Sequence, residues 1–276
     1  MAEVSEYQVL EAIYQTGFVL EFHAASILRK FTGKLRMNLH SLNELAYLGG
    51  LDEPSTVETD LVFEDFHYNS ASGIVSLFQC KGGRNSDLLI LIETDEINPV
   101  RYEKINIRGA EIGFNKNRSF QICDGNTIVC HTGDFFQLNT KNSLQSRGQK
   151  NSFYEGIRQL NNSIASYYKY EADGKSLFEL VPVIITNCEI SIVRFKKDQE
   201  INIEKPTIFR NVKWCLYKNE LQFINGSLGI DFNWGYFTDE GGFTPASIGK
   251  NIPYFWIVNV SALEEFMSTR HELYEK

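Results

Sequence analysis

Cysteine and proline are both scarce in this chain, and neither provides a structural framework. There are five cysteines and six prolines. The cysteine number is odd and no CxxC pair occurs, which argues against a disulfide scaffold. Cys123, Cys130 and His131 lie close in sequence, but they lack the paired ligand spacing of structural zinc sites. We therefore expect reduced thiols in or near the core of a cytoplasmic protein.

Long apolar runs are also missing. No stretch of the sequence approaches the roughly 20 apolar residues that a membrane-spanning helix needs. The N-terminal segment lacks the basic start and the continuous apolar stretch of a signal peptide. We expect a soluble protein that does not associate with membranes.

Positive charge is in short supply, since the formal net charge is −8 and the pI is near 5.3. This argues against a protein that coats nucleic acid nonspecifically, because that mode of binding needs a strongly basic surface. It leaves room for a metal-dependent hydrolase. Carboxylates that hold metal ions add negative charge, and a local basic patch can coexist with a negative total.

Several catalytic and ligand-binding signatures are absent as well. No GxxxxGK[ST] or GxGxxG sequence follows a predicted strand, which argues against a phosphate loop or a dinucleotide site. There is no GxSxG sequence, so an α/β-hydrolase has no support. The five histidines are scattered without HExxH spacing.

What the chain does contain is ordinary globular material, with 43% hydrophobic and 22% charged residues. Helical periodicity predicts helices over 4–31, with a break near Gly17, over 153–168 and over 262–275. Apolar or alternating runs predict strands over 60–66, 74–81, 88–92, 127–130, 180–186, 190–195, 214–217 and 254–260. We expect residues 34–47 to be irregular.

This order of elements predicts an α/β fold with a central mixed β-sheet flanked by helices. We find no clean boundary and expect one elaborated domain over 1–276. Its core would span about 15–195, with a long insertion at about 95–150 and a C-terminal extension over 196–276.

Two neighbouring strands bring a carboxylate, an amide and a lysine together. Asp60 begins the first strand, and Gln79 and Lys81 end the second. Since alternate residues of a strand face the same side, Gln79 and Lys81 project together while Cys80 points to the opposite, buried side. Carboxylate and amide oxygens suit hard Mg²⁺, and a lysine adds positive charge beside a phosphate. This set suits phosphodiester hydrolysis.

An Asp, a spacer and then an acidic-or-Gln, x, Lys triplet on the next strand resembles the PD-(D/E)xK nuclease superfamily. The segment Gly17–Glu21 is similar to the family's helix that supplies a glutamate. Segments 157–160 and 181–187 resemble the helix and the strand that follow the triplet. The resemblance covers about residues 15 to 195.

The resemblance implies a restriction-endonuclease-like core and Mg²⁺- or Mn²⁺-dependent hydrolysis of DNA. Glu21, Asp60 and Gln79 would hold the metal, and Lys81 and Gln159 would complete the catalytic set. The Gln-x-Lys form also resembles methylated-DNA restriction enzymes, which implies a role in restriction or anti-phage defence. Cleavage of both DNA strands usually needs two active sites, which favours a homodimer.

The sequence departs from the family at three positions. Thr59 stands where the family name has proline, and Gln79 stands where an acid is usual. A neutral amide binds metal less tightly than a carboxylate, so Gln79→Glu is expected to tighten Mg²⁺ binding. Ser163 occupies the fourth position after Gln159, so we do not assign the RecB-like subfamily, which has tyrosine there.

Gln79 therefore keeps an alternative open, in which a catalytically inactive nuclease-like protein binds nucleic acid or a partner without cutting. A structural subunit of a larger complex is a second alternative, favoured by the acidic pI and the aromatic-rich C-terminal third. Taken singly, Asp60, Lys81 and Glu21 are more often solvent-facing residues than catalytic ones. Their order along the chain favours the nuclease.

Overall fold

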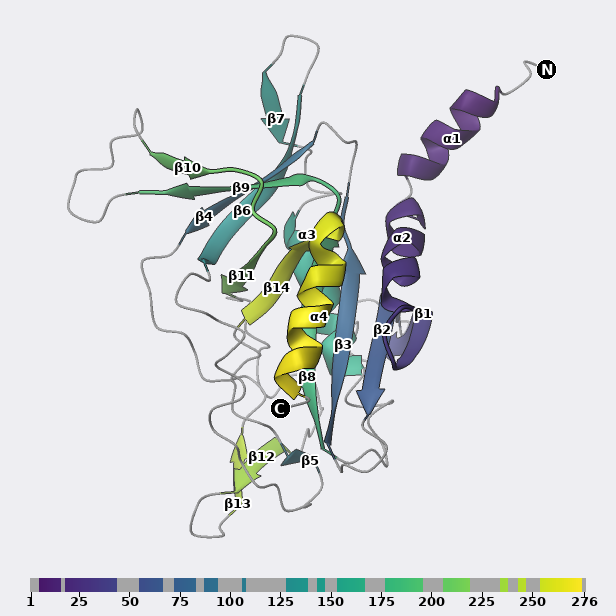
Figure 1. Cartoon of the computed structure of the whole chain (residues 1–276), viewed down its shortest axis with the longest axis vertical. Helices are drawn as coiled ribbons and strands as arrows, with labels where there is room; N and C mark the ends of the chain where they lie inside the picture. The colour runs from purple at the N-terminus through teal and green to yellow at the C-terminus, as the bar shows by residue number, and fades with distance from the viewer. Residues whose placement is uncertain are drawn as a thin grey trace.

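The chain forms an α/β structure with a large mixed sheet and few helices (Figure 1). This computed structural model describes residues 5–15, 18–43, 55–66, 72–82, 87–93, 106–107, 128–138, 143–146, 153–166, 177–195, 206–218, 234–237, 243–246 and 254–274. The helices are α1 (Glu6–Gln15), α2 (Phe18–Leu28), α3 (Phe153–Ser166) and α4 (Leu263–Tyr274), the last preceded by the short 3-10 helix η5 (Val260–Ala262).

The strands extend along most of the described chain. They are β1 (Lys34–Asn43), β2 (Ser55–Phe66), β3 (Ser72–Cys80), β4 (Leu88–Glu93), β5 (Asn106–Ile107), β6 (Val129–Leu138), β7 (Leu144–Ser146), β8 (Leu177–Thr186), β9 (Glu189–Arg194), β10 (Thr207–Phe209), β11 (Trp214–Lys218), β12 (Trp234–Phe237), β13 (Phe243–Ala246) and β14 (Tyr254–Asn259). The predicted fold class is thus confirmed at the level of a mixed sheet flanked by helices.

The large sheet has the order β1-β2-β3-β8-β14-β11-β6-β4-β9-β10, with β7 added to β6. Strands β1, β2 and β3 form an antiparallel meander. Strand β3 then pairs in parallel with β8, and β8 pairs in parallel with β14. Helix α3 lies in the connection from β3 to β8. Strands β13, β12 and β5 form a second, three-stranded sheet.

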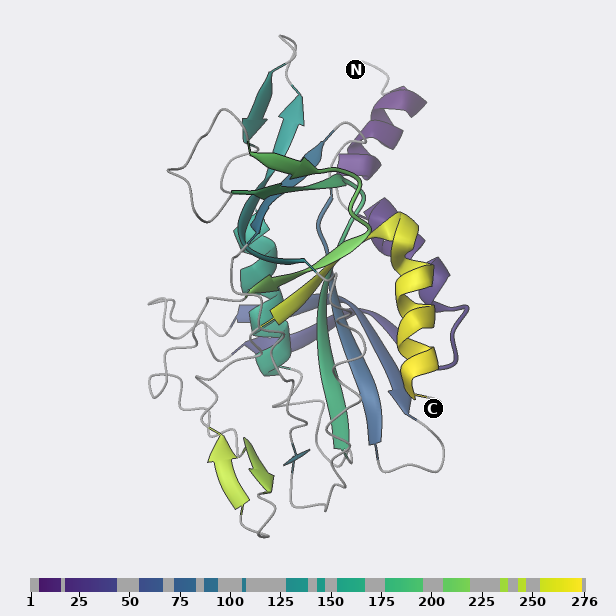
Figure 2. The same ribbon diagram turned by 60° about the vertical axis from the view of Figure 1, so that its left-hand side comes forward.

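Two hydrophobic clusters cover the two faces of this sheet, because side chains alternate along each strand. On one face Val62 and Leu77 pack with α3. On the other face Leu61 and Phe78 pack with α2 and α4. Figure 2 shows α3 on one side of β8, β3 and β2, with α2 and α4 on the other side.

Helix α3 is amphipathic, and its apolar stripe faces the sheet as predicted. The residues of this stripe that are buried are Phe153, Ile157, Leu160 and Ile164. On its outer side, Arg158 pairs with Glu155 at 2.6 Å. Residues 167–168, which belong to the predicted helix, lie outside the described residues.

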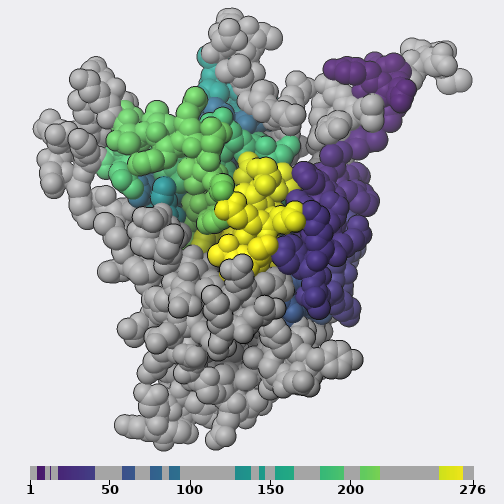
Figure 3. All heavy atoms as spheres, in the orientation of Figure 1, coloured from purple at the N-terminus to yellow at the C-terminus, as the bar shows by residue number. Residues whose placement is uncertain are grey.

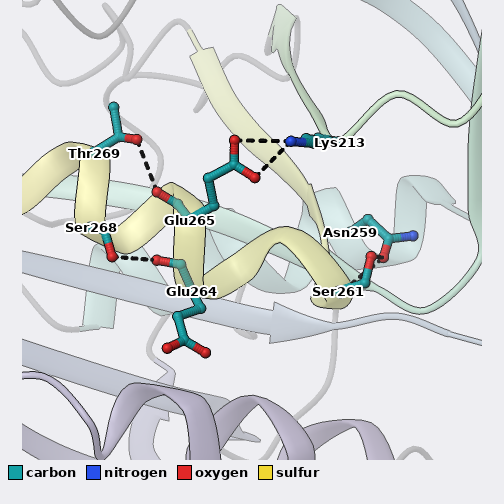
Figure 4. Close-up of polar contacts among 7 residues, drawn as sticks. All are labelled: Lys213, Asn259, Ser261, Glu264, Glu265, Ser268 and Thr269. Carbon is teal, nitrogen blue, oxygen red and sulfur yellow. Dashed lines mark hydrogen bonds and ion pairs between the residues drawn. The ribbon is translucent and has the colours of Figure 1, made fainter.

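Helix α4 is fixed beside α2, as the space-filling view shows (Figure 3). The 3-10 helix η5 that precedes it is capped, since the Asn259 side chain accepts a hydrogen bond from the Ser261 N–H at 2.9 Å (Figure 4). Lys213 pairs with Glu265 at 2.7 Å, and Lys30 of the α2–β1 turn pairs with Glu264 at 2.5 Å. These contacts lie on the side of the sheet opposite α3.

Three segments differ from expectation. Residues 34–43, expected to be irregular, form the edge strand β1. Within the range expected as an insertion, β6 joins the large sheet between β11 and β4, while 94–105 and 108–127 lie outside the described residues. Helix α2 ends at Leu28, three residues before the predicted end at residue 31. A Cβ at Gly33 would lie 2.4 Å from the Phe63 ring, so this glycine permits close packing.

The expected pair of helices near the N-terminus is present as α1 and α2. Within the described chain, every helix is too short or too polar to cross a membrane.

Candidate active site

Strands β2 and β3 separate at Asp60. Their last pair is Leu61 with Phe78, whereas β3 stays paired with β8 as far as Cys80. Beyond this point the Asp60 carboxylate replaces a backbone partner, because the Cys80 N–H donates to Asp60 Oδ2 at 2.6 Å. The backbone of the Gln79-Cys80-Lys81 triplet therefore fixes the position of this carboxylate.

The neighbouring strand β1 is also irregular at this level. Its pairs with β2 include Met37 with Leu61 and Leu39 with Thr59, but skip Asn38. Asn38 has a φ of 49°, in the left-handed region that asparagine tolerates better than most residues. By its register Asn38 stands opposite Asp60. The pairing of β2 is therefore irregular at Asp60 on both sides, with β1 and with β3.

Gln79 fills the space between the separated strands and is only 1% exposed. Its Nε2 donates to the Glu58 carbonyl oxygen of β2 at 2.9 Å. The same nitrogen donates to Ser163 Oγ of α3 at 3.3 Å. The amide thus bridges two strands and a helix.

Lys81 follows β3 directly, and its own N–H donates to the Ile185 carbonyl at 2.8 Å. Its side chain lies along α3, where a Cβ at Gly156 would come within 2.8 Å of Lys81 Cγ. Within the described residues, its ammonium group forms no ion pair. Its charge nevertheless opposes the rise that burial causes in the pKa values of Asp60 and Glu21.

Glu21 enters from α2, on the face opposite Gln79 and Lys81, and is 9% exposed. Burial and the nearby charges of Asp60 and Glu58 raise the pKa of Glu21 to about 7. Burial also raises the pKa of Asp60 to about 6, against the Cys80 hydrogen bond and Lys81. Because Asp60 ionises first, its charge acts on Glu21. Two partly buried carboxylates therefore share one region.

Gln159 lies on the same stripe of α3 as Gly156 and Ser163, at helical three- and four-residue spacing. Gly156 touches Lys81 and Ser163 touches Gln79, so this stripe faces the candidate site. Gln159 Oε1 is buried, and no described residue donates a hydrogen bond to it. Gln79, Lys81 and Gln159 thus lie on the α3 side of the point where β2 and β3 separate. Glu21, which we expected on the same side, lies on the α2 side, near enough to Asp60 for their charges to interact.

These residues fit a hard divalent cation, although they do not form a cluster of three acids. Among the described residues, no group of three or more His, Cys, Asp or Glu side chains is arranged to hold a metal. The oxygen donors are instead two carboxylates, Glu21 and Asp60, and the amide of Gln79. Burial is the main cause of the raised pKa values of Glu21 and Asp60, because it disfavours their charged forms, and a bound cation would favour those forms again.

Cys80 does not belong to this donor set. It is buried in the hydrophobic cluster on the α2 face, away from Gln79, as strand alternation predicts. Burial raises the pKa of the Cys80 thiol well above its usual range, so it stays protonated. Cys80 contributes to the site only through its backbone N–H, which donates to Asp60 Oδ2.

Sequence reasoning missed Ser163, Gly156 and the Glu58 carbonyl as neighbours of the site. Helical spacing from Gln159 was the available signal for the first two, while the third depends on where the strands separate. Comparison of the chain with protein-family models, with curated proteins and with solved structures found no match in any of the three.

Proposed function

We propose that this chain is a divalent-metal-dependent nuclease that hydrolyses phosphodiester bonds in DNA. The observation that carries the proposal is the meeting of Asp60, Gln79 and Lys81 where β2 and β3 separate, with Glu21 entering from the opposite face. The order of elements adds support. A helix with Glu21, a strand with Asp60, a strand with the triplet, then α3 and the parallel strand β8 follow the order of a restriction-endonuclease-like core.

The side chains divide the work in this proposal. Asp60, Glu21 and the Gln79 carbonyl oxygen would hold Mg²⁺ or Mn²⁺. When bound, the cation lowers the pKa of water and stabilises charge on phosphate oxygens. The Cys80 N–H keeps the Asp60 carboxylate in place.

Lys81 is suited to bind the phosphate. Of the partly buried lysine and arginine side chains in the described chain, Arg36 pairs with Glu64 at 2.6 Å, whereas Lys81 has no ion-pair partner. Its ammonium group lies near enough to the carboxylates to lower their pKa values without being neutralised by them. A positive charge placed in this way favours an anionic transition state.

A role in restriction or anti-phage defence is proposed on the Gln-x-Lys resemblance alone, and a homodimer on the need for two cuts. One observation favours a second function. Only two carboxylates serve the site among the described residues, which suits a nuclease-like protein that binds nucleic acid without cutting.

Nicking of supercoiled plasmid in Mg²⁺ or Mn²⁺ separates the two functions. The wild type should nick the plasmid, EDTA should abolish nicking, and Lys81→Ala should slow it by about 100-fold or more. Lys30→Ala, a matched lysine on the α4 side, should nick normally. The free energy of unfolding of Lys81→Ala should change by less than about 0.5 kcal/mol.

The contrary outcomes are also distinct. A wild-type protein that shifts DNA on a gel in EDTA but never nicks it would support the non-cutting binder. A protein that neither nicks nor shifts DNA would contradict both functions.

A further inference from the structure

The buried amide of Gln79 donates to two groups, the Glu58 carbonyl and the Ser163 hydroxyl. The Glu58 carbonyl has no hydrogen to give, and it receives one from Nε2 at 2.9 Å. Ser163 has a single hydroxyl hydrogen, which it donates to the Gln159 carbonyl at 3.0 Å. Its oxygen therefore accepts from Gln79, which it does at 3.3 Å.

This chemistry fixes which way the amide faces. Both hydrogens of Nε2 are engaged. An inverted amide would place Oε1 against the Glu58 carbonyl, which can only accept, and Ser163 could bond to Oε1 only by giving up its hydrogen bond to the Gln159 carbonyl. Gln79 is 1% exposed and Ser163 is fully buried, so water does not replace these partners. The carbonyl oxygen is consequently held on the side away from Ser163 and the Glu58 carbonyl.

We propose that Ser163 is a positioning residue which, with the Glu58 carbonyl, keeps the Gln79 carbonyl oxygen turned toward the cation. The site is then built for an amide at position 79. This rests on the proposed function, because it takes Gln79 as a metal ligand. A fixed orientation matters for an amide, since its other end carries N–H groups that repel a cation, whereas a carboxylate offers oxygen at both ends.

The expected effect of Ser163→Ala is a loss of about 3- to 10-fold in cation affinity, the equivalent of one hydrogen bond. The loss should vanish in the Gln79→Ala background, where no amide remains to be oriented. Ser163→Thr, which keeps a hydroxyl group, should restore affinity. A merely structural serine would instead lower affinity by the same factor whatever residue occupies position 79.

Calorimetric titration with Mn²⁺ tests this on the full chain, using wild type, Ser163→Ala, Gln79→Ala and the double variant. Ser191→Ala is the matched control, a buried serine on β9 with five strands between β9 and β3 in the sheet. Thermal unfolding without metal shows that each variant folds. If the extra methyl group destabilises Ser163→Thr, the positioning role is judged from the wild type, the two single variants and the double variant.

The positioning role is supported if the wild type binds Mn²⁺ and if Ser163→Ala lowers Mn²⁺ affinity in the wild type but not in the Gln79→Ala variant. An unchanged affinity in Ser163→Ala, or an equal loss in both backgrounds, overturns that role and leaves the proposed nuclease standing. A wild type that binds no Mn²⁺ overturns the metal site itself, and with it both proposals.

Discussion

Removing the Glu21 carboxylate should stabilise the metal-free protein at alkaline pH, contrary to the usual effect of changing a buried residue. Glu21 is 9% exposed, lies near the charge of Asp60, and has no hydrogen-bond partner among the described residues. Glu21→Gln keeps the shape of the side chain and removes the charge. Burial of the charged Glu21 carboxylate, and next its repulsion by Asp60, therefore destabilise the protein when no cation is bound.

The magnitude follows from the pKa of Glu21, which rises from 4.5 to about 7. Each pKa unit corresponds to about 1.4 kcal/mol, which sets an upper limit of about 3 kcal/mol. Screening by solvent at this partly open site reduces the expected gain to about 1–2 kcal/mol. Because the folded protein holds a proton that the unfolded chain releases, stability should fall between about pH 4.5 and 7.

Urea unfolding of wild type and Glu21→Gln at pH 5 and pH 8, in EDTA, measures this directly. The variant should gain stability at pH 8 and little at pH 5. Saturating Mn²⁺ should reverse the order at pH 8, since the wild type gains binding energy by linkage. Glu6→Gln, an exposed glutamate on α1, is the matched control. A variant less stable than wild type at pH 8 without metal would refute the reasoning.

Two further substitutions test the surroundings of the site. Gly156→Ala normally favours a helix by about 1 kcal/mol, but here its Cβ would lie 2.8 Å from Lys81 Cγ. It should therefore displace Lys81 and impair plasmid nicking while the protein stays folded. Combined with Lys81→Ala, it should slow nicking no further than Lys81→Ala alone. Normal nicking by Gly156→Ala would contradict this. Gln79→Glu should lower the metal-free free energy of unfolding at pH 8 by about 1–3 kcal/mol, because its carboxylate would face the Glu58 carbonyl, which can only accept, and would draw the Ser163 hydroxyl away from the Gln159 carbonyl. Equal stability in urea would show that Ser163 and the Glu58 carbonyl do not constrain position 79.

The candidate site was largely predictable because it depends on local patterns. Strand alternation placed Gln79 and Lys81 on one face and Cys80 on the other, and the structure has this arrangement. Helical periodicity gave the stripe of α3. The role of each residue stays a prediction, since geometry alone does not show catalysis.

What the sequence did not provide comes from contacts between distant segments. The edge strand β1 was missed although its half-buried Leu35, Met37 and Leu39 alternate with polar residues, a pattern that favours a strand. Its pairing with β2 is interrupted at the left-handed Asn38. Strand β6 was expected within an insertion because its place between β11 and β4 depends on nonlocal pairing. A local sequence pattern does not show which strands pair with one another.

The Gln79 amide gives the clearest case of tertiary information changing an expectation. From sequence, Gln79→Glu should simply tighten Mg²⁺ binding, because a charge replaces a neutral group. The two acceptors beside Nε2 add a cost that no local pattern contains. Stability and affinity therefore have to be measured separately for this variant.

A crystal structure of the protein with Mn²⁺ tests most directly whether Asp60, Gln79 and Glu21 hold a divalent cation. The predicted result is an anomalous peak at bonding distance from an Asp60 carboxylate oxygen and from Gln79 Oε1, with Glu21 beside it and Lys81 Nζ unligated. A peak elsewhere, or a Gln79 side chain that turns Nε2 toward the ion, would contradict the proposed site.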